Sequence, residues 1–327
     1  MAKRVWLYAA ALVFTVVTCM AASDVLAAYP ENPVEVIVHS SPGGGSDLFA
    51  RQIANILERE GLIKQKLQVV NRTGGGAAMA VNYLAGKKND PYVFMNTTTG
   101  PLTTVLRGAT RLKFEELVPI AMLAEDPNLV FTSFDSPYKS MKDVITAAKK
   151  APKTVNVAIG TIGGSEHICA HRVAKAAGVE FNIVAFKGGG EAAAALLGGH
   201  VDLSFGNVQE QMGQIEAKKV RALATMTDTR LPFLPNIPTM KEEGINAVYT
   251  QFRGFWAAPG FPDYAVKYWE DTFEKLMKSP AFKEYLKSNQ AVESFRKHED
   301  FKQYLVKYVE VLQKDIDTLE IYKEKKK

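Results

Sequence analysis

The stretch "HSSPGGGSDLFAR", residues 39–51, decides how this chain folds. A short apolar run at 36–38 precedes it, and from 48 to 60 apolar residues recur on one face of a helix. The three glycines at 43–45 therefore join a strand to the start of a helix. Their backbone N–H groups are unscreened by side chains and lie at the positive end of the helix dipole. The stretch predicts a turn that binds an anion, or else a tight turn in which Ser46 only caps the helix.

The same unit of strand, turn and helix recurs along the chain. Residues 67–70 lead into the glycines at 74–76 and a helical stretch at 77–85, and residues 92–95 lead into the loop 96–100. This alternation is typical of βαβ units. It predicts a largely parallel sheet with ligand sites at the carboxyl ends of the strands.

A second series of units begins after Asp126-Pro127. Its strands are expected at 129–132, 155–159, 181–185, 201–205 and 220–226, with a second glycine turn at 160–165. A return crossing is expected at 249–259, followed by helices from 263 to 322. The chain therefore predicts two α/β halves. Two facing helix N-termini would suit a ligand with two negative groups, such as a dicarboxylate.

The first 27 residues have the composition of a signal peptide. Lys3 and Arg4 precede an apolar run at 5–17, and Val25-Leu26-Ala27 suits a signal-peptidase site. We expect cleavage after Ala27 and export to the periplasm. The alternative is an uncleaved anchor, since weakly apolar residues extend the run to Ala22.

Charge and cysteine content argue against two further classes of protein, those held by disulfides and those that bind nucleic acids. Without the signal peptide, Cys169 is the single cysteine, so we expect no intramolecular disulfide and a buried thiol. The net charge of +5 for the full chain owes much to the lysines at 323–327. No basic stripe with interleaved aromatic residues indicates a nucleic-acid partner.

A nucleotide-dependent enzyme is the main competing interpretation. Gly43-x-Gly45 lacks the third glycine of a dinucleotide fingerprint at Leu48, and Asn71-Arg72 stands where the ribose-binding acid is expected. NADP is disfavoured by this pattern, although Arg72 leaves it open. No phosphate-binding P-loop motif is present, and no nucleophile elbow surrounds Ser165. We therefore expect neither a cofactor nor an enzymatic activity.

Three polar residues near the turns have structural as well as functional interpretations. His167 and His171 are four residues apart on one helix face, but without further ligands they do not predict a metal site. Asp47 complements the helix dipole and is expected to start the helix, or else to meet an amino group of a ligand.

The ordered motifs resemble the solute-binding receptors of tripartite tricarboxylate transporters, the TctC or Bug family. They run from Pro33-Val34 through Ser41-Pro42-Gly43-Gly44-Gly45-Ser46-Asp47, Val70-Asn71-Arg72, Phe186-Lys187-Gly188-Gly189, Arg221-Ala222-Leu223-Ala224 and Leu234-Pro235-x-Ile237-Pro238-Thr239 to Gly254-x-x-Ala257-x-Pro259. The resemblance spans nearly all of the chain after the signal peptide.

This resemblance implies a type II periplasmic-binding-protein fold with a ligand cleft between two α/β domains joined by two crossover segments. Domain 1 would comprise 28–128 and 252–327, and domain 2 would comprise 129–251. The protein would be a monomeric receptor that passes a small organic carboxylate to membrane permease subunits, or a sensory receptor of the same fold. The binding residues expected here are His39, Ser41, Gly43, Gly44, Gly45, Ser46, Thr97, Thr98, Gly163, Gly164, Ser165, His167, Lys187, Gly188 and Asn207.

One departure from the family pattern concerns the choice of ligand. His39-Ser40 replaces the proline and aromatic pair that is common before the first glycine turn. We expect these two positions to determine which carboxylate is bound.

Overall fold

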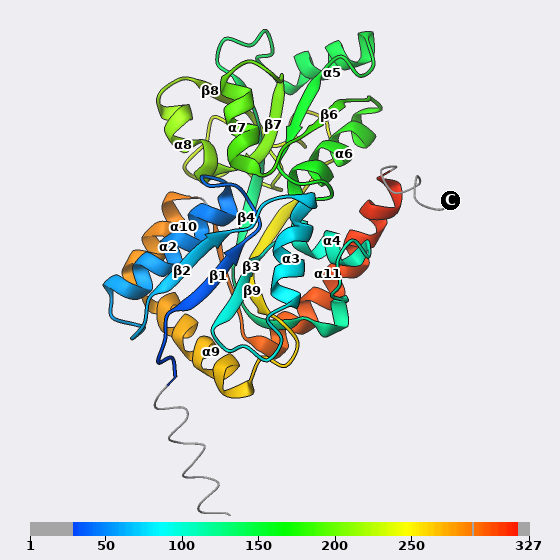
Figure 1. Ribbon diagram of the computed structural model, residues 1–327. Coiled ribbons are helices and arrows are strands. Elements are labelled where there is room, and N and C mark those ends of the chain that lie inside the picture. Colours follow the sequence, from blue (N-terminus) through cyan, green and yellow to red (C-terminus); the bar gives the residue numbers. More distant parts are fainter. Residues whose placement is uncertain (1–28, 290, 320–327) are drawn as a thin grey trace, which may run out of the picture.

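The computed structural model describes residues 29–289 and 291–319, so the predicted signal peptide lies outside the described residues. The described chain forms two α/β lobes, and the strand β4 (Val118–Ser133) runs through both (Figure 1). No helix in these ranges is both long enough and apolar enough to cross a membrane.

The first lobe is built from the two ends of the described chain. Its N-terminal elements are β1 (Val34–Val38), α2 (Gly45–Arg59), β2 (Leu67–Asn71), η1 (Gly75–Ala77), α3 (Ala78–Ala85), β3 (Val93–Thr97), α4 (Thr99–Leu106) and η2 (Phe114–Glu116). Its C-terminal elements are β9 (Thr250–Ala257), α9 (Asp263–Lys278), α10 (Pro280–Ser288), β10 (Val292–Arg296) and α11 (His298–Thr318).

The second lobe is built from the middle of the chain. Its elements are α5 (Met141–Lys150), β5 (Asn156–Ile159), α6 (Ser165–Ala177), β6 (Asn182–Ala185), α7 (Gly189–Leu197), β7 (Leu203–Asn207), α8 (Val208–Glu216) and β8 (Val220–Thr225). They lie together above α2 and α3 in the view of Figure 1.

The strands follow the order β2-β1-β3-β9-β4-β7-β5-β6, with β8 and β10 also paired to β4. β1 is parallel to β2 and β3, and β5 is parallel to β6 and β7, as the βαβ pattern predicts. β4 pairs with β9 from Val118 to Pro127 and with β7 from Asn128 to Phe131. The change of partner falls where the sequence pattern places the start of the second series, but it lies within one continuous strand.

One part of the sequence-based prediction is wrong. The stretch from 263 to 322 was expected to contain helices only, yet β10 interrupts it and pairs antiparallel with β4, with Val292 opposite Glu125. Because β10 pairs with a single neighbour and is largely exposed or partly buried, its residues carry no strong apolar alternation.

The core of the first lobe is aromatic around the central strand β9. Every β9 residue after Thr250 is buried, because helices cover both faces of the sheet at this point. Phe255 and Phe273 stack at 5.1 Å between ring centres, and Trp269 of α9 packs edge-on against Phe94 at 4.9 Å. In the second lobe Cys169 is fully buried and free, as expected from the sequence.

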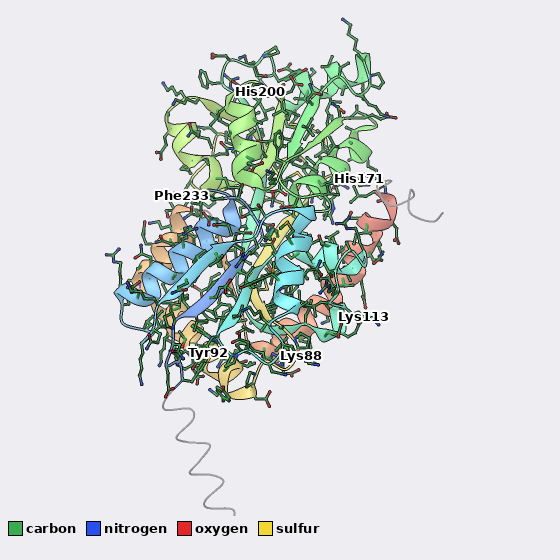
Figure 2. The ribbon with its side chains drawn as sticks, in the orientation of Figure 1. Lys88, Tyr92, Lys113, His171, His200 and Phe233 are labelled. Atoms are coloured by element: carbon green, nitrogen blue, oxygen red, sulfur yellow. The ribbon has the colours of Figure 1, made fainter. Side chains whose placement is uncertain are left out.

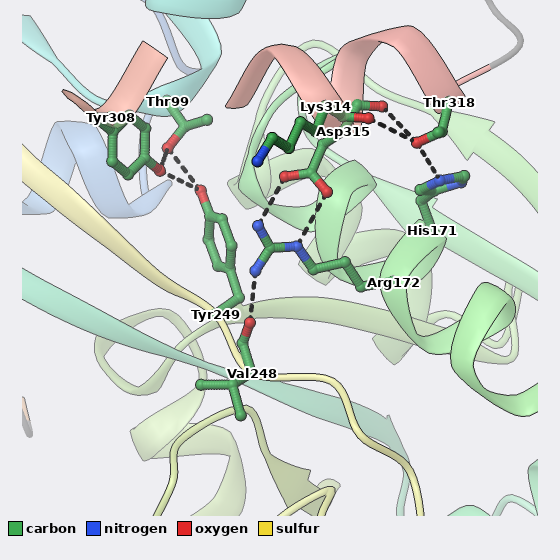
Figure 3. Close-up of polar contacts among 9 residues, drawn as sticks. All are labelled: Thr99, His171, Arg172, Val248, Tyr249, Tyr308, Lys314, Asp315 and Thr318. Atoms are coloured by element: carbon green, nitrogen blue, oxygen red, sulfur yellow. Dashed lines mark hydrogen bonds and ion pairs between the residues drawn. The ribbon is translucent and has the colours of Figure 1, made fainter. Parts of the chain in front are cut away.

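The lobes also contact each other along the flanks of the cleft. On one side, Arg172 of α6 pairs with Asp315 of α11 at 2.7 Å and donates to the carbonyl of Val248 at 2.6 Å (Figure 3). On the other side, the exposed Phe233 lies near α10, with the Lys287 ammonium group 5.6 Å from its ring centre (Figure 2). Both sides of the molecule therefore have a contact between residues of different lobes.

Candidate functional site

The two glycine turns have the same geometry at positions 120 residues apart. Gly43 and Gly163 both have positive φ, of 82° and 75°. In each turn the next glycine donates to the carbonyl three residues earlier, Gly44 to Ser41 at 3.1 Å and Gly164 to Thr161 at 2.9 Å. Helices α2 and α6 then begin at equivalent places. The repetition seen in the sequence is therefore a structural repeat.

The fourth residue after each positive-φ glycine closes its turn. The Asp47 carboxylate accepts from the N–H of Gly43 at 3.0 Å, and Nδ1 of His167 accepts from the N–H of Gly163 at 3.1 Å. Asp47 also accepts from Arg51 at 2.8 Å. Burial lowers the pKa of His167 to about 4, so its ring is neutral and can accept. Both side chains therefore serve as scaffold in this structure.

A small cavity lies between the lobes where the turns meet. Its walls include the first turns or N-caps of five described helices, at Gly45 (α2), Thr98 (α4), Ser165 (α6), Gly189 (α7) and Asn207 (α8). The positive ends of these helix dipoles converge on one space, as expected at the carboxyl ends of parallel strands. The cavity measures about 20 Å³, room for about one water molecule. A larger ligand requires the lobes to move apart.

Two glutamate carboxyl groups lie at this cavity. Glu210 of α8 accepts from the N–H of Gly45 at 2.5 Å across the lobes and from the N–H of Asn207 at 3.1 Å. Glu166 of α6 accepts from the Ser165 hydroxyl at 3.3 Å. Burial, and then the charge of Glu210, raise the pKa of Glu166 to about 7. Burial also raises the pKa of Glu210.

Two other wall residues have polar atoms without partners. His39 and Ser40 are each only 5% exposed, and neither Nδ1 of His39 nor Oγ of Ser40 has a hydrogen-bond partner in the described chain. Burial, and then the nearby charge of Arg253, lower the pKa of His39 to about 3. The ring is therefore neutral and can donate or accept.

A buried ion pair lies close to the cavity. Arg253 of β9 pairs with Asp126 of β4, and both side chains are almost fully buried. Arg253 also donates to the amide oxygen of Asn207 at 2.7 Å, and Gln251 donates to the same oxygen at 3.1 Å. The pair thus holds Asn207, the N-cap of α8, against the strands that cross between the lobes.

The predicted site residues fall into two groups. Those that line the cavity are His39, Gly45, Ser46, Thr98, Gly164, Ser165 and Asn207. Those that do not line it are Ser41, Gly43, Gly44, Thr97, Gly163, His167, Lys187 and Gly188. Of the second group, His167 lines a different surface hollow with His171, and Lys187 is exposed.

Gly188 of the second group, together with Gly190 and Gly160, makes room for backbone instead. A Cβ atom on Gly188 would lie 2.5 Å from the backbone nitrogen of Ser41, and one on Gly190 would lie 2.5 Å from the carbonyl oxygen of Pro42. A Cβ on Gly160 would lie 2.4 Å from the nitrogen of Gly189. The loop at 188–190 therefore packs against both turns at distances that only glycine permits.

Seven residues that line the cavity are absent from the list of expected binding residues, although one of them, Ser40, was expected to help determine which carboxylate is bound. They are Ser40, Gly100, Thr161, Glu166, Gly189, Glu210 and Gln251. Glu210 carried a usable signal, because Asn207-x-x-Glu210 has the spacing of a capping box. Within the described residues no three side chains of metal-ligating type gather.

Two α/β lobes, joined by crossing segments around a cleft lined by helix N-termini, define a type II periplasmic binding protein. The model of the tripartite tricarboxylate transporter family receptor, TctC, matches residues 49–318. The chain belongs to this family, as its motifs predicted.

Individual relatives agree over most of their length. Protein BugT of Bordetella pertussis is 28% identical over 271 residues, covering 82% of this chain and 80% of BugT. The structure of the periplasmic binding protein BugD is 26% identical, with a TM-score of 0.79 over 88% of this chain and 98% of BugD. R. palustris Rpa4515 with adipate has a TM-score of 0.83 at 24% identity, covering 89% and 98% of the two chains, and shows the same fold.

Proposed function

We propose that this chain is an exported receptor that captures a small organic carboxylate between its lobes and delivers it to the permease of a tripartite tricarboxylate transporter. The observation that carries the proposal is the convergence of five helix N-termini on one cavity in the described chain. Such termini stabilise negative charge through their dipoles and their free N–H groups. The adipate named with the R. palustris structure is a carboxylate, which supports the same ligand class.

The remaining parts of the proposal follow from this role. The protein acts in the periplasm as a monomer after removal of residues 1–27, without a cofactor and without catalysis. Residues 28–128 and 252–327 form one ligand-gripping domain, and 129–251 form the other. The switch of partners along β4 at Asn128 supports this division.

A titration of the protein from residue 28 onward with organic carboxylates tests the proposal. Binding should raise the free energy of unfolding by about 2.7 kcal/mol at a ligand concentration one hundred times the dissociation constant. NADP and ATP serve as controls. Stabilisation by a nucleotide and by no carboxylate would favour an enzyme and contradict the proposal.

A further inference from the structure

The carboxylate of Glu210 occupies an anion position at the start of α2. One of its oxygens accepts from the N–H of Gly45 at 2.5 Å, although the two residues belong to opposite lobes. Its other oxygen accepts from the N–H of Asn207 at 3.1 Å and completes the capping box of α8. A helix N-terminus stabilises a negative group placed in this way. The position that a ligand carboxylate would take at α2 is therefore filled by a carboxylate of the protein itself.

A buried guanidinium group adds positive charge at the same position. Gly45 has no side chain, and a Cβ atom there would lie 2.7 Å from Nη2 of Arg253 and 3.1 Å from the nearer Glu210 oxygen. Nη1 of Arg253 is buried without a hydrogen-bond partner in the described chain. Burial raises the pKa of Glu210, and its two backbone hydrogen bonds and then the charge of Arg253 oppose that rise. The position therefore favours a carboxylate through both the helix N-terminus and Arg253.

Two further polar side chains at this cavity need partners. Nδ1 of His39 and Oγ of Ser40 lack hydrogen-bond partners in the described chain, and each side chain is only 5% exposed, so a ligand in the cavity can satisfy them. The cavity of about 20 Å³ has room for about one water molecule, so the lobes must separate before an organic ligand enters. Separation breaks the bond between Glu210 and Gly45, because the two residues lie on opposite lobes.

Building on the proposed function, we propose that Glu210 is a built-in competitor of the ligand. Its carboxylate holds the lobes together without a ligand, and it must leave Gly45 before a ligand carboxylate can bind there. The incoming carboxylate gains the N–H of Gly45 and the charge of Arg253. It also comes close to Glu210, which stays on the second lobe through its bond to Asn207. Because like charges repel, Glu210 lowers the affinity of the receptor for carboxylates.

Glu210→Gln separates this role from a structural one. Glutamine also completes a capping box at this position, so α8 keeps its cap while the negative charge is lost. Calorimetry measures succinate, adipate, citrate, benzoate and glutamate against the protein from residue 28 onward. Those that bind the wild type should bind Glu210→Gln about tenfold more tightly, because a competing charge-assisted hydrogen bond has been removed. A residue that only supports the fold, or that grips the ligand, would give equal or weaker binding when it is changed.

Glu216→Gln is the control, because Glu216 is exposed on the same helix as Glu210 and the charge change is identical. It should bind carboxylates as the wild type does. Circular dichroism and urea unfolding establish that each variant is folded. If Glu210→Gln binds no more tightly than the wild type, the inference is wrong, while the proposed function stands because a carboxylate binds.

Small-angle X-ray scattering tests the contact between the lobes separately from ligand binding. Each protein is unfolded in urea, dialysed and refolded to remove bound solutes. The wild type and Glu216→Gln should scatter as the closed structure does, and Glu210→Gln should have a larger radius of gyration because its lobes separate. Equal radii for the wild type and Glu210→Gln overturn the inference. If no carboxylate binds any of the three proteins, the proposed function itself fails, and the scattering alone decides whether Glu210 holds the lobes together.

Discussion

The carboxyl group of Glu166 shares its cavity with Glu210, and this links its charge to folding stability. Burial and Glu210 raise its pKa to about 7, from an ordinary value near 4.5 in the unfolded chain. Folding therefore favours its neutral form, so the contribution of Glu166 to stability is greatest below pH 4.5 and is lost as the pH rises towards 7.

Glu166→Gln should remove the loss of stability that the ionisation of Glu166 causes as the pH rises. Urea unfolding at pH 5 and pH 8 should show that the variant loses less stability than the wild type over this range. Glu216→Gln, an exposed change of the same kind, should follow the wild-type curve. Parallel curves for Glu166→Gln and the wild type would contradict the placement of Glu166 in a desolvated cavity.

Ser165 and Ser41 occupy different places although both were predicted to bind the ligand. Ser165 lines the cavity at the start of α6, whereas Ser41 lies against Gly188 outside it. Ser165→Ala should weaken ligand binding by about tenfold, as expected for loss of a hydrogen bond to a charged group. Ser41→Ala should change affinity by less than about threefold. Equal effects in calorimetry would contradict this assignment of the cavity wall.

Gly188 tests whether the second glycine loop is a packing surface. A Cβ there would meet the nitrogen of Ser41 at 2.5 Å, so Gly188→Ala should lower the free energy of unfolding by about 1–3 kcal/mol. Gly213→Ala is the control, because Gly213 lies in α8 with no atom within 4 Å of the added methyl group. That change should raise stability by up to about 1 kcal/mol. If both variants change the free energy of unfolding equally, the close packing of Gly188 against the backbone of Ser41 does not require glycine.

Sequence reasoning identified part of the cavity wall and missed the rest for a physical reason. His39 and Ser40 were singled out by their unusual position and do line the cavity. Glu210 was missed although its capping spacing was visible, because its contact with Gly45 joins residues 165 positions apart. Local pattern reveals which groups a turn offers, but not which side chain from the other lobe reaches them.

The crossing strands β4 and β9 carry the buried ion pair of Asp126 and Arg253. Both side chains are almost fully buried, so removing one charge leaves the other desolvated and uncompensated. Asp126→Asn should therefore lower the free energy of unfolding by about 3–5 kcal/mol. Lys66→Gln, which removes an exposed ion pair with Glu58, should cost at most about 1 kcal/mol. If urea unfolding shows comparable losses of unfolding free energy for the two variants, burial does not determine how much stability is lost when an ion pair is broken.

Most elements of the fold could be predicted because each has a periodic apolar face. The strand, turn and helix units that open at β1 and β5 were recognised with their glycine turns. β10 was missed because it is a short strand with a single neighbour and little burial, so pairing with β4 defines it more than its own residues do. The continuity of β4 was missed because its residues from Val118 to Ser133 pass through two lobes with different partners.

At the scale of the whole molecule, the contacts between the lobes include one set beside α11 and one at the cavity. Arg172 pairs with Asp315, and the hydroxyl groups of Tyr249, Thr99 and Tyr308 hydrogen-bond to one another between 2.6 and 3.1 Å, on the flank beside α11 (Figure 3). The Glu210 bond to Gly45 crosses the cavity itself. Opening for a ligand must break the contact at the cavity, while β4 and the segment before β9 keep the lobes joined. We therefore expect a hinge motion about the crossing segments.

Native mass spectrometry of the protein from residue 28 onward, mixed with small organic acids, amino acids and nucleotides, tests the central claim most directly. The account predicts a complex of one chain with one carboxylate-bearing solute, and a weaker complex for Ser165→Ala. A complex with a nucleotide, or no complex with any carboxylate at concentrations that saturate such receptors, would contradict it.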